Sequence, residues 1–280
     1  MGRLALVAVL LVLGGTACGE RSEPTGPTAP LYPVTIQTGD RPLVVSHAAR
    51  SIAVFDPAAQ TILDGLGVGG RVVLTGSDAS LDLREVRRAR PDLIIASPEG
   101  NERDLSRAAS ATGARVYTAP GDSIRQVERA ITQLGLLTGR PVTARRLVRQ
   151  IENRRDQVAT RLARVPTIRV FVDVGFLNTV PEQSLIGDVL REAHATNVVQ
   201  SPEPGPVDTA DLLRLDPQVY LATSDAEVTL KELRSGQLRK LRAVKAGHFV
   251  VADAELLQPG PRIGDGLLQV ARLLHPNAFR

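Results

Sequence analysis

A unit made of a helix, a proline and a strand occurs twice in the chain at a constant spacing. Asp82–Ser97 aligns with Asp208–Thr223, an offset of 208 − 82 = 126 residues. Pro91 matches Pro217, and each stands between a helical stretch and an apolar run. Because Pro interrupts a helix, each unit predicts a helix, a stop and a buried strand. The repeat favours two similar α/β lobes, with chance likeness between two helix–strand units as the alternative.

Strand and helix patterns alternate along both halves of the chain, which predicts a mainly parallel sheet in each lobe. The predicted strands are residues 52–55, 92–96, 115–117, 168–174, 218–222 and 248–251. Residues 143–165 separate the halves and would span roughly 34 Å as one helix. Arg154 and Arg155 interrupt the apolar stripe of this helix, as expected where a helix contacts a different lobe at each end. We interpret its seven arginines as a solvated face.

The N-terminus has the pattern of an export signal. Arg3 is followed by the apolar run Leu4–Leu13, which is too short to span a bilayer as a helix. Small residues then lead to Cys18, the single cysteine of the chain. This arrangement resembles a bacterial lipobox, although Gly15 stands where Leu is usual. We expect Cys18 to carry lipid and to anchor the protein at the cell envelope; plain secretion with an incidental cysteine is the alternative.

The following 24 or so residues are rich in Pro, Ser, Thr and Gly, and we expect them to form an extended tether. The predicted organisation is a signal peptide at 1–17, a lipid-anchored tether at 18–42, an N-terminal lobe at 43–141, a bridging helix at 142–165 and a C-terminal lobe at 166–280.

Composition and motifs argue against nucleic-acid binding and catalysis. Lys and Arg exceed Asp and Glu by only 34 − 30 = 4, and the basic residues are scattered. The glycine-rich segment 65–70 follows a predicted helix, whereas a dinucleotide-binding loop must follow a strand. The four histidines lack metal-ligand spacing. We therefore expect no enzyme activity, no catalytic residue, no metal site and no cofactor.

The ordered set of segments resembles the periplasmic binding proteins for ferric siderophores, haem and cobalamin. It comprises 51–73, 90–96, 185–199, 215–219, 243–251 and 259–262, and the likeness covers roughly residues 43–276. The resemblance implies two Rossmann-like lobes joined by one long rigid helix, with ligand in the cleft between them. It implies a monomer that binds a ferric siderophore, cobalamin or haem and delivers it to an ABC permease in the inner membrane, from the periplasm or the outer face of the cytoplasmic membrane.

Two departures from the family bear on function. Family members tend to expose one glutamate on each lobe for the permease, but Arg84 and Ala210 stand at those positions. Glu85 and Asp211 follow them at equivalent places of the repeat, and we expect these carboxylates to take the docking role. An orphan lipoprotein of the same fold, with a protein-interaction or sensing role and no transporter, is the alternative. A secreted enzyme is disfavoured because no catalytic constellation is present.

Ligands of parallel α/β sheets lie beyond the carboxyl ends of the strands. Applied to the predicted strands, this rule selects the following ligand-binding candidates: Phe55, Ser97, Glu99, Phe176, Asn178, Thr223, Ser224, Gln258 and Arg262. Phe176 is the expected apolar wall, because strand-end loops seldom expose a ring without a purpose. Arg262 is expected either to hold an anionic chelate or to anchor the last helix. We interpret Asp56 as a helix cap only.

Overall fold

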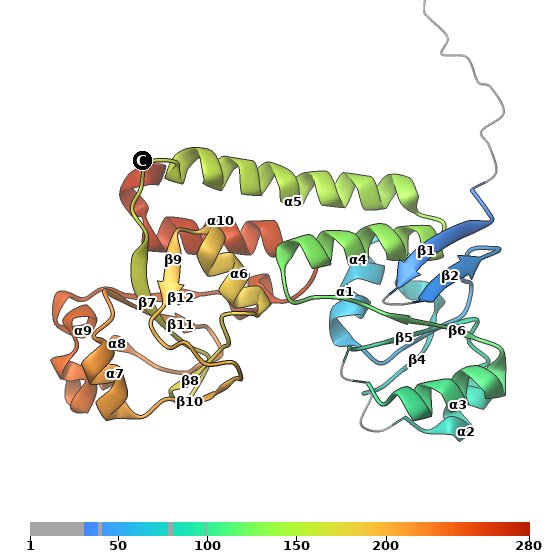
Figure 1. The fold of residues 1–280 in the computed structure, drawn as a ribbon, viewed down its shortest axis with the longest axis horizontal. Coiled ribbons are helices and arrows are strands. Elements are labelled where there is room, and N and C mark those ends of the chain that lie inside the picture. Colours follow the sequence, from blue (N-terminus) through green and yellow to red (C-terminus); the bar gives the residue numbers. More distant parts are fainter. Residues whose placement is uncertain (1–30, 39–40, 78–80, 99) are drawn as a thin grey trace, which may run out of the picture. The chain divides into compact units, whose positions relative to one another are not determined.

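Two four-stranded parallel sheets form the framework of the protein in the computed structural model, which describes residues 31–38, 41–77, 81–98 and 100–280 (Figure 1). The first sheet has the strand order β4-β3-β5-β6 and the second has β12-β11-β7-β9. The strands are β3 (Ile52–Val54), β4 (Val72–Thr75), β5 (Leu93–Ala96), β6 (Arg115–Thr118), β7 (Ile168–Asp173), β9 (Ala195–Asn197), β11 (Val219–Thr223) and β12 (Phe249–Ala252). The predicted α/β class with mainly parallel sheets is confirmed.

Helices connect the parallel strands, as crossovers between such strands require. We call the first sheet with α1–α4 the N-terminal lobe and the second sheet with α6–α10 the C-terminal lobe. The helices are α1 (Pro57–Gly65), α2 (Leu83–Ala89), α3 (Glu102–Thr112), α4 (Ile124–Leu137), α6 (Leu185–Glu192), α7 (Thr209–Leu215), α8 (Leu230–Ser235), α9 (Arg242–Ala246) and α10 (Ile263–Leu274). Short 3₁₀ turns lie at Gly69–Arg71, Gln237–Lys240, Ala254–Leu257 and Pro276–Phe279, and β8 (Asn178–Thr179) pairs antiparallel with β10 (Gly205–Pro206) in a separate two-stranded sheet.

The two repeat units adopt the same local structure. Asp82 caps α2 by accepting a hydrogen bond from the second residue after it, and Asp208 caps α7 in the same way. Both helices end at a residue with positive φ, 48° at Arg90 and 41° at Asp216, and Pro follows each. The strands that come next, β5 and β11, each occupy an inner position of their sheet. The 126-residue offset thus marks equivalent helix–strand units in the two lobes.

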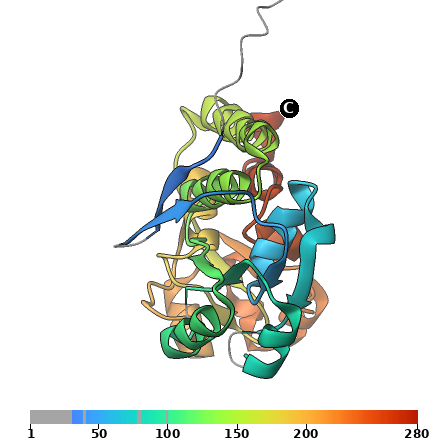
Figure 2. The ribbon, with the colours of Figure 1, turned by 90° about the vertical axis from the view of Figure 1, so that its right-hand side faces the viewer.

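One long helix, α5 (Pro141–Leu162), links the lobes, where the sequence predicted 142–165. It packs against α4 of the N-terminal lobe and against α10 of the C-terminal lobe (Figures 1 and 2). Two glycines permit these close approaches. A Cβ at Gly135 on α4 would lie 2.3 Å from the Ala144 Cβ, and one at Gly264 on α10 would lie 3.0 Å from the Ile151 Cα. Any larger side chain at either position would push α5 away from its neighbour.

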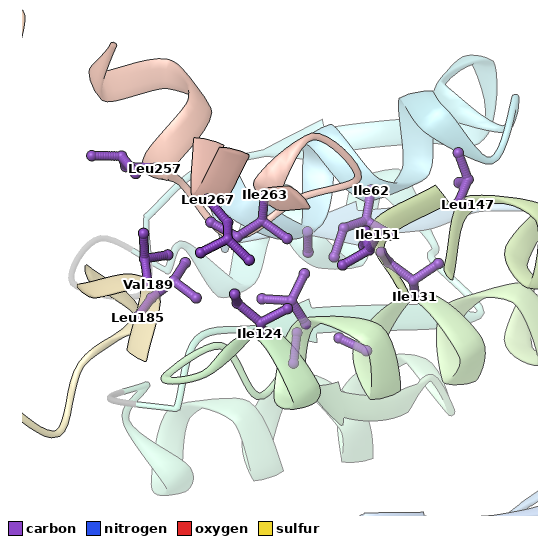
Figure 3. Close-up of a cluster of buried hydrophobic side chains, with 14 of the residues drawn as sticks. Ile62, Ile124, Ile131, Leu147, Ile151, Leu185, Val189, Leu257, Ile263 and Leu267 are labelled. Atoms are coloured by element: carbon purple, nitrogen blue, oxygen red, sulfur yellow. The ribbon is translucent and has the colours of Figure 1, made fainter. Parts of the chain in front are cut away.

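The largest hydrophobic core cluster contains residues of both lobes, each lobe has a smaller cluster of its own, and residues Tyr32–Arg280 form one compact unit. Figure 3 shows the part of this core in which α1, α4, α5, α6 and α10 meet. The labelled side chains there are Ile62, Ile124, Ile131, Leu147, Ile151, Leu185, Val189, Leu257, Ile263 and Leu267. Because both lobes contribute to the same core, separating them would expose apolar surface at a cost of about 25 cal/mol per Å².

The interpretation of all α5 arginines as a solvated face is wrong for Arg155. Its side chain is only 19% exposed, and it forms ion pairs with Glu128 on α4 at 3.2 Å and Glu192 on α6 at 2.7 Å. The adjacent Arg154 pairs with Asp265 on α10 at 2.9 Å. The charged residues in the middle of α5 therefore connect the two lobes, because a helix placed between lobes has neighbours on more than one side.

The predicted tether extends too far toward the C-terminus. Val34–Thr38 forms strand β1, which pairs antiparallel with β2 (Arg41–Val45). Ile36 and Val45 are buried in the shared core, and the Tyr32 hydroxyl donates to the Leu136 carbonyl at 2.6 Å. The alternating apolar residues of this segment outweigh its prolines, since Pro42 is tolerated in a two-stranded hairpin.

The predicted signal peptide, the lipid-attachment residue Cys18 and the candidate Glu99 lie outside the described residues. Within the described ranges, no helix has the length and apolar character needed to cross a membrane.

Candidate functional site

A cavity of about 250 Å³ lies between the two lobes. Its N-terminal-lobe wall is formed by residues that follow β3, β5 and β6, and its C-terminal-lobe wall by Leu185 at the start of α6 and Pro259 before α10. The lining residues are Asp56, Ala58, Ala59, Ile62, Ser97, Pro98, Ala119, Pro120, Gly121, Asp122, Leu185 and Pro259. The carboxyl ends of parallel strands meet at this edge, which is where ligands of such sheets bind. We call this space the inter-lobe cavity.

Two aspartates give the inter-lobe cavity its charge. Asp56 is only 8% exposed and caps α1 by accepting from the Ala58 amide at 2.9 Å. Asp122 is exposed and precedes α4. Burial, reinforced by the nearby Asp56 carboxylate, raises the pKa of Tyr117, whose hydroxyl donates to Gln133 Oε1 at 2.8 Å. Asp56 therefore acts as a helix cap and also presents negative charge to the cavity.

The edge of the inter-lobe cavity is held by a hydrogen bond between the lobes. The amide of Ile124, at the start of α4, donates to Asp188 Oδ2 on α6 at 2.8 Å. Asp188 is buried and pairs through its other oxygen with Arg191. A carboxylate at a helix N-terminus is favoured by the helix dipole as well as by the hydrogen bond. This contact fixes the two helices whose first residues border the cavity.

A second hollow, of about 510 Å³, lies within the C-terminal lobe. Phe176 lines it and is 90% exposed, on a loop in which Phe176 and Leu177 both have positive φ. Asp173, buried at the end of β7, accepts from the Gly175 amide at 2.8 Å and from the Tyr220 hydroxyl. Burial and this hydrogen bond raise the pKa of Tyr220. The carboxylate of Asp173 therefore stabilises the loop that carries the exposed Phe176 ring.

The predicted ligand residues are dispersed, and the structure brings few of them together. Ser97 lines the inter-lobe cavity and Phe176 lines the hollow of the C-terminal lobe. Gln258 is exposed and lines neither of these spaces. Asn178 Nδ2 donates to the Gly175 carbonyl at 2.8 Å, and Ser224 Oγ accepts from the Ala254 amide at 3.0 Å. The last two side chains therefore support loops at the strand ends.

Three predictions of ligand contact are corrected by burial and position. Phe55 and Thr223 are each 4% exposed; the Phe55 ring packs in a core cluster, and Thr223 Oγ1 faces the Asp173 carbonyl at 3.4 Å. Arg262 is exposed but lines a different hollow, between α5 and α10, together with Arg154. Side chains along a strand alternate between the two faces of the sheet, so position at a strand end did not decide the direction of Phe55 or Thr223. The direction of Arg262 is set by its place at the start of α10.

Sequence reasoning missed part of the inter-lobe cavity. The sequence indicates a capping role for both Asp56 and Asp122 and does not select either as a ligand contact; the structure confirms the cap at Asp56 but has Ser123 as the N-cap of α4. The strand-end rule applied to the predicted strand 115–117 selects residues 119–122. Leu185 and Pro259 carried no signal, because they reach the cavity only through the packing of α6 and α10.

The larger surface hollows do not bring residues of both lobes together at the strand ends of a sheet. A groove of about 920 Å³ between α2 and α3 is lined by helix-surface residues of one lobe, among them Arg87, Arg103 and Arg107. The inter-lobe cavity alone among these spaces joins residues of both lobes at the strand ends of the first sheet. Across the described ranges, no cluster of three or more His, Cys, Asp or Glu side chains is placed to hold a metal ion.

Glu85 and Asp211 lie at equivalent positions in the first turns of α2 and α7, and both are exposed. Asp211 forms an ion pair with Arg214 one turn further along α7. Among the described residues, Glu85 has no such partner within 4.0 Å. The two carboxylates therefore differ in how much unpaired charge they present.

The two lobes, the connecting helix and the inter-lobe cavity define a two-lobed binding protein. The chain belongs to the periplasmic binding protein family, whose model matches residues 40–256, and the predicted family is confirmed. A relative from Bacillus subtilis, the uncharacterized ABC transporter substrate-binding lipoprotein YvrC, is 23% identical over 309 aligned positions, covering 99% of this chain and 96% of YvrC.

Solved structures share the fold at low identity. The vitamin B12 binding protein BtuF of Vibrio cholerae is 20% identical with a TM-score of 0.71, covering 83% of this chain and 98% of BtuF. The molybdate-binding protein MolA of Haemophilus influenzae is 14% identical with a TM-score of 0.77, covering 88% and 92%. The heme-binding protein RhuT from Roseiflexus sp. RS-1 is 17% identical with a TM-score of 0.68, covering 82% and 100%.

Proposed function

We propose that this protein is the substrate-binding component of an ABC importer and that it captures a small metal chelate in the inter-lobe cavity. The observation that carries the proposal is the position of that cavity, at the strand ends of one sheet and closed by the other lobe. Membership of the periplasmic binding protein family and the description of YvrC as an ABC transporter lipoprotein support it. The protein acts as a monomer and not as an enzyme.

The ligand class rests on the chemistry of the structural neighbours and on the size of the cavity. Proteins of this fold bind vitamin B12, haem or molybdate. At about 250 Å³ the inter-lobe cavity is smaller than the 300–1,000 Å³ of common small-molecule sites, and none of the described residues that line it is aromatic. A ferric siderophore, with a compact metal centre and peripheral arms, fits these properties better than a flat corrin or haem ring, which gains most from aromatic contact.

Filling the cavity tests the proposal. Ser97→Tyr places a ring in the inter-lobe cavity and should abolish binding of the chelate that stabilises the wild-type protein. Ser106→Tyr, in the groove between α2 and α3, is the matched control and should bind normally. Binding is measured by calorimetry, because the chain has no Trp to report it. Equal binding by both variants would refute this location, and absence of binding across ferric siderophores, cobalamin and haem would refute the ligand class.

Export and delivery complete the proposed function. Lipid on Cys18 would hold the protein at the cell envelope, with the residues before Tyr32 as the tether. Glu85 and Asp211, one on each lobe, would steer docking on the permease, since exposed charges act mainly on association. Ligand binding that persists with no cognate permease would instead favour the orphan lipoprotein of the same fold.

A further inference from the structure

We infer that the inter-lobe cavity selects a chelate with net positive charge over an anionic one. This inference deepens the proposed function and rests on it. Asp56 and Asp122 are the charged side chains among the described residues that line the cavity, and neither Lys, Arg nor His is among them. The other lining groups are apolar side chains, backbone and the Ser97 hydroxyl. Within the part of the lining that the structure describes, a ligand in this space therefore meets two carboxylates.

The arginines nearest to this lining in the sequence face other spaces. Arg125, three residues after Asp122, and Arg191, on α6, line a hollow beside α5 together with Glu128 and Glu192. Arg262, three residues after Pro259, lines the hollow between α5 and α10. Three of the segments that contribute to the cavity, at Asp122, Leu185 and Pro259, are thus each followed by an arginine that lines a different hollow.

Helix N-termini do not neutralise the cavity. The N-terminus of α1 lies against Asp56, and that of α4 lies beside Asp122 but already binds Asp188. A helix N-terminus is equivalent to about half of one positive charge, so each offsets only part of a carboxylate. Asp56 is nearly buried, where water screens its charge poorly. The cavity therefore keeps a negative potential.

The hollow of the C-terminal lobe is also lined by carboxylates. Asp173, Glu227 and Glu232 line it together with Phe176, and its lining includes no Lys or Arg among the residues that the structure describes. If a ligand extends from the inter-lobe cavity toward this lobe, it meets further carboxylates. An anionic tris-catecholate or the propionates of haem would face these groups without a partner, whereas a ferric complex that carries an ammonium group would be attracted.

Ferric complexes of defined charge test the inference by calorimetry at low and high salt. The probes are ferrioxamine B, which carries a free ammonium group, neutral ferrichrome and the anionic ferric enterobactin, together with diaquacobinamide as a cationic and dicyanocobinamide as a neutral corrinoid. We expect ferrioxamine B to bind about tenfold more tightly than ferrichrome, and diaquacobinamide about tenfold more tightly than dicyanocobinamide. Added salt should weaken the binding of the cationic probes but not of the neutral ones.

The double variant Asp56→Asn/Asp122→Asn should reduce the ratio of cationic to neutral affinity from about tenfold to about one, and this ratio is the readout. Asn caps a helix about as well as Asp, so α1 stays capped. The control Asp82→Asn alters the equivalent cap of α2, outside the cavity, and should keep the preference. The charge inference alone would be overturned if ferric enterobactin bound more tightly than ferrichrome. It would also be overturned if the double variant kept the tenfold preference for the cationic probe. Binding of none of the five probes would overturn the proposed function and this inference with it.

Discussion

Replacing Arg155 by Met should destabilise the protein far more than replacing any solvated arginine of α5. The guanidinium pairs with Glu192 through two nitrogens, at 2.7 and 2.9 Å, and with Glu128 at 3.2 Å. The exposed fractions of the three side chains are 19% for Arg155, 13% for Glu128 and 23% for Glu192. Met keeps most of the apolar stem, so the change removes the charge and leaves two carboxylates facing each other in a poorly solvated space.

The size of the effect follows from this burial. Removing one partner of a fully buried ion pair costs about 3–5 kcal/mol, and an exposed pair contributes about 0.2–1 kcal/mol. The Arg155 cluster is mostly but not fully buried, which places the expected loss at about 2 kcal/mol. In a protein of this size, 1 kcal/mol lowers the melting temperature by about 2–4 °C. We therefore expect a decrease of about 4–8 °C.

The loss of unfolding free energy caused by Arg155→Met should depend on pH. Burial, partly offset by Arg155, already raises the pKa of Glu128 in the folded protein. A carboxyl whose folded pKa is raised binds protons more readily when folded, so its contribution to stability falls as pH rises through the interval between the unfolded and folded pKa values. Removing Arg155 raises the folded pKa of Glu128 further. The stability difference between Arg155→Met and wild type should thus be larger at pH 8 than near pH 4.5.

Urea unfolding followed by circular dichroism, at both pH values, measures this prediction. Arg146→Met, at an exposed position of the same helix, is the matched control and should change the free energy of unfolding by less than about 0.5 kcal/mol. The triple variant Glu128→Gln/Arg155→Met/Glu192→Gln should recover most of the loss, because no uncompensated charge remains. A loss at Arg155 no larger than at Arg146, or one independent of pH, would refute the reasoning.

Three further predictions concern function. Phe176→Ala should weaken binding of a chelate that reaches from the inter-lobe cavity into the hollow of the C-terminal lobe, with less than about 1 kcal/mol loss of stability because the ring is 90% exposed; unchanged affinity in calorimetry would confine the ligand to the inter-lobe cavity. Cys18→Ser should move the protein from the membrane fraction to the soluble fraction, and mass spectrometry of the N-terminal peptide should show loss of lipid; retention without lipid would contradict the anchor. Glu85→Arg with Asp211→Arg should reduce uptake while calorimetry shows intact ligand binding, and wild-type uptake would exclude the docking role.

Much of the fold was predictable because local chemistry specified it. The repeat unit carries its own signals, an Asp cap at Asp82 and Asp208 and a Pro after each helix, and these act within a few residues of chain. The hairpin β1–β2 was missed because its prolines and polar residues match a tether. Its strands are held by burial of Ile36 and Val45 in a core built from distant residues.

The candidate site was less predictable, because side-chain direction depends on packing between elements. The strand-end rule selected Ser97, which lines the inter-lobe cavity, and also Phe55, whose ring packs in a core cluster. Arg262 follows a strand in sequence, yet α10 directs it toward α5. No local pattern distinguishes Ser97 from Phe55, since each directly follows a strand of the first sheet.

The sequence by itself determined the two α/β lobes, the long helix between them and the family to which the chain belongs. Periodicity, caps and proline stops are read within one element, so they survive without knowledge of its neighbours. Only the tertiary structure decided that Arg155 joins two lobes, that one core cluster contains residues of both, and that the inter-lobe cavity is lined by carboxylates while its nearest arginines face elsewhere. These properties arise where helices from distant parts of the sequence meet, and their packing fixes which side chains share a space.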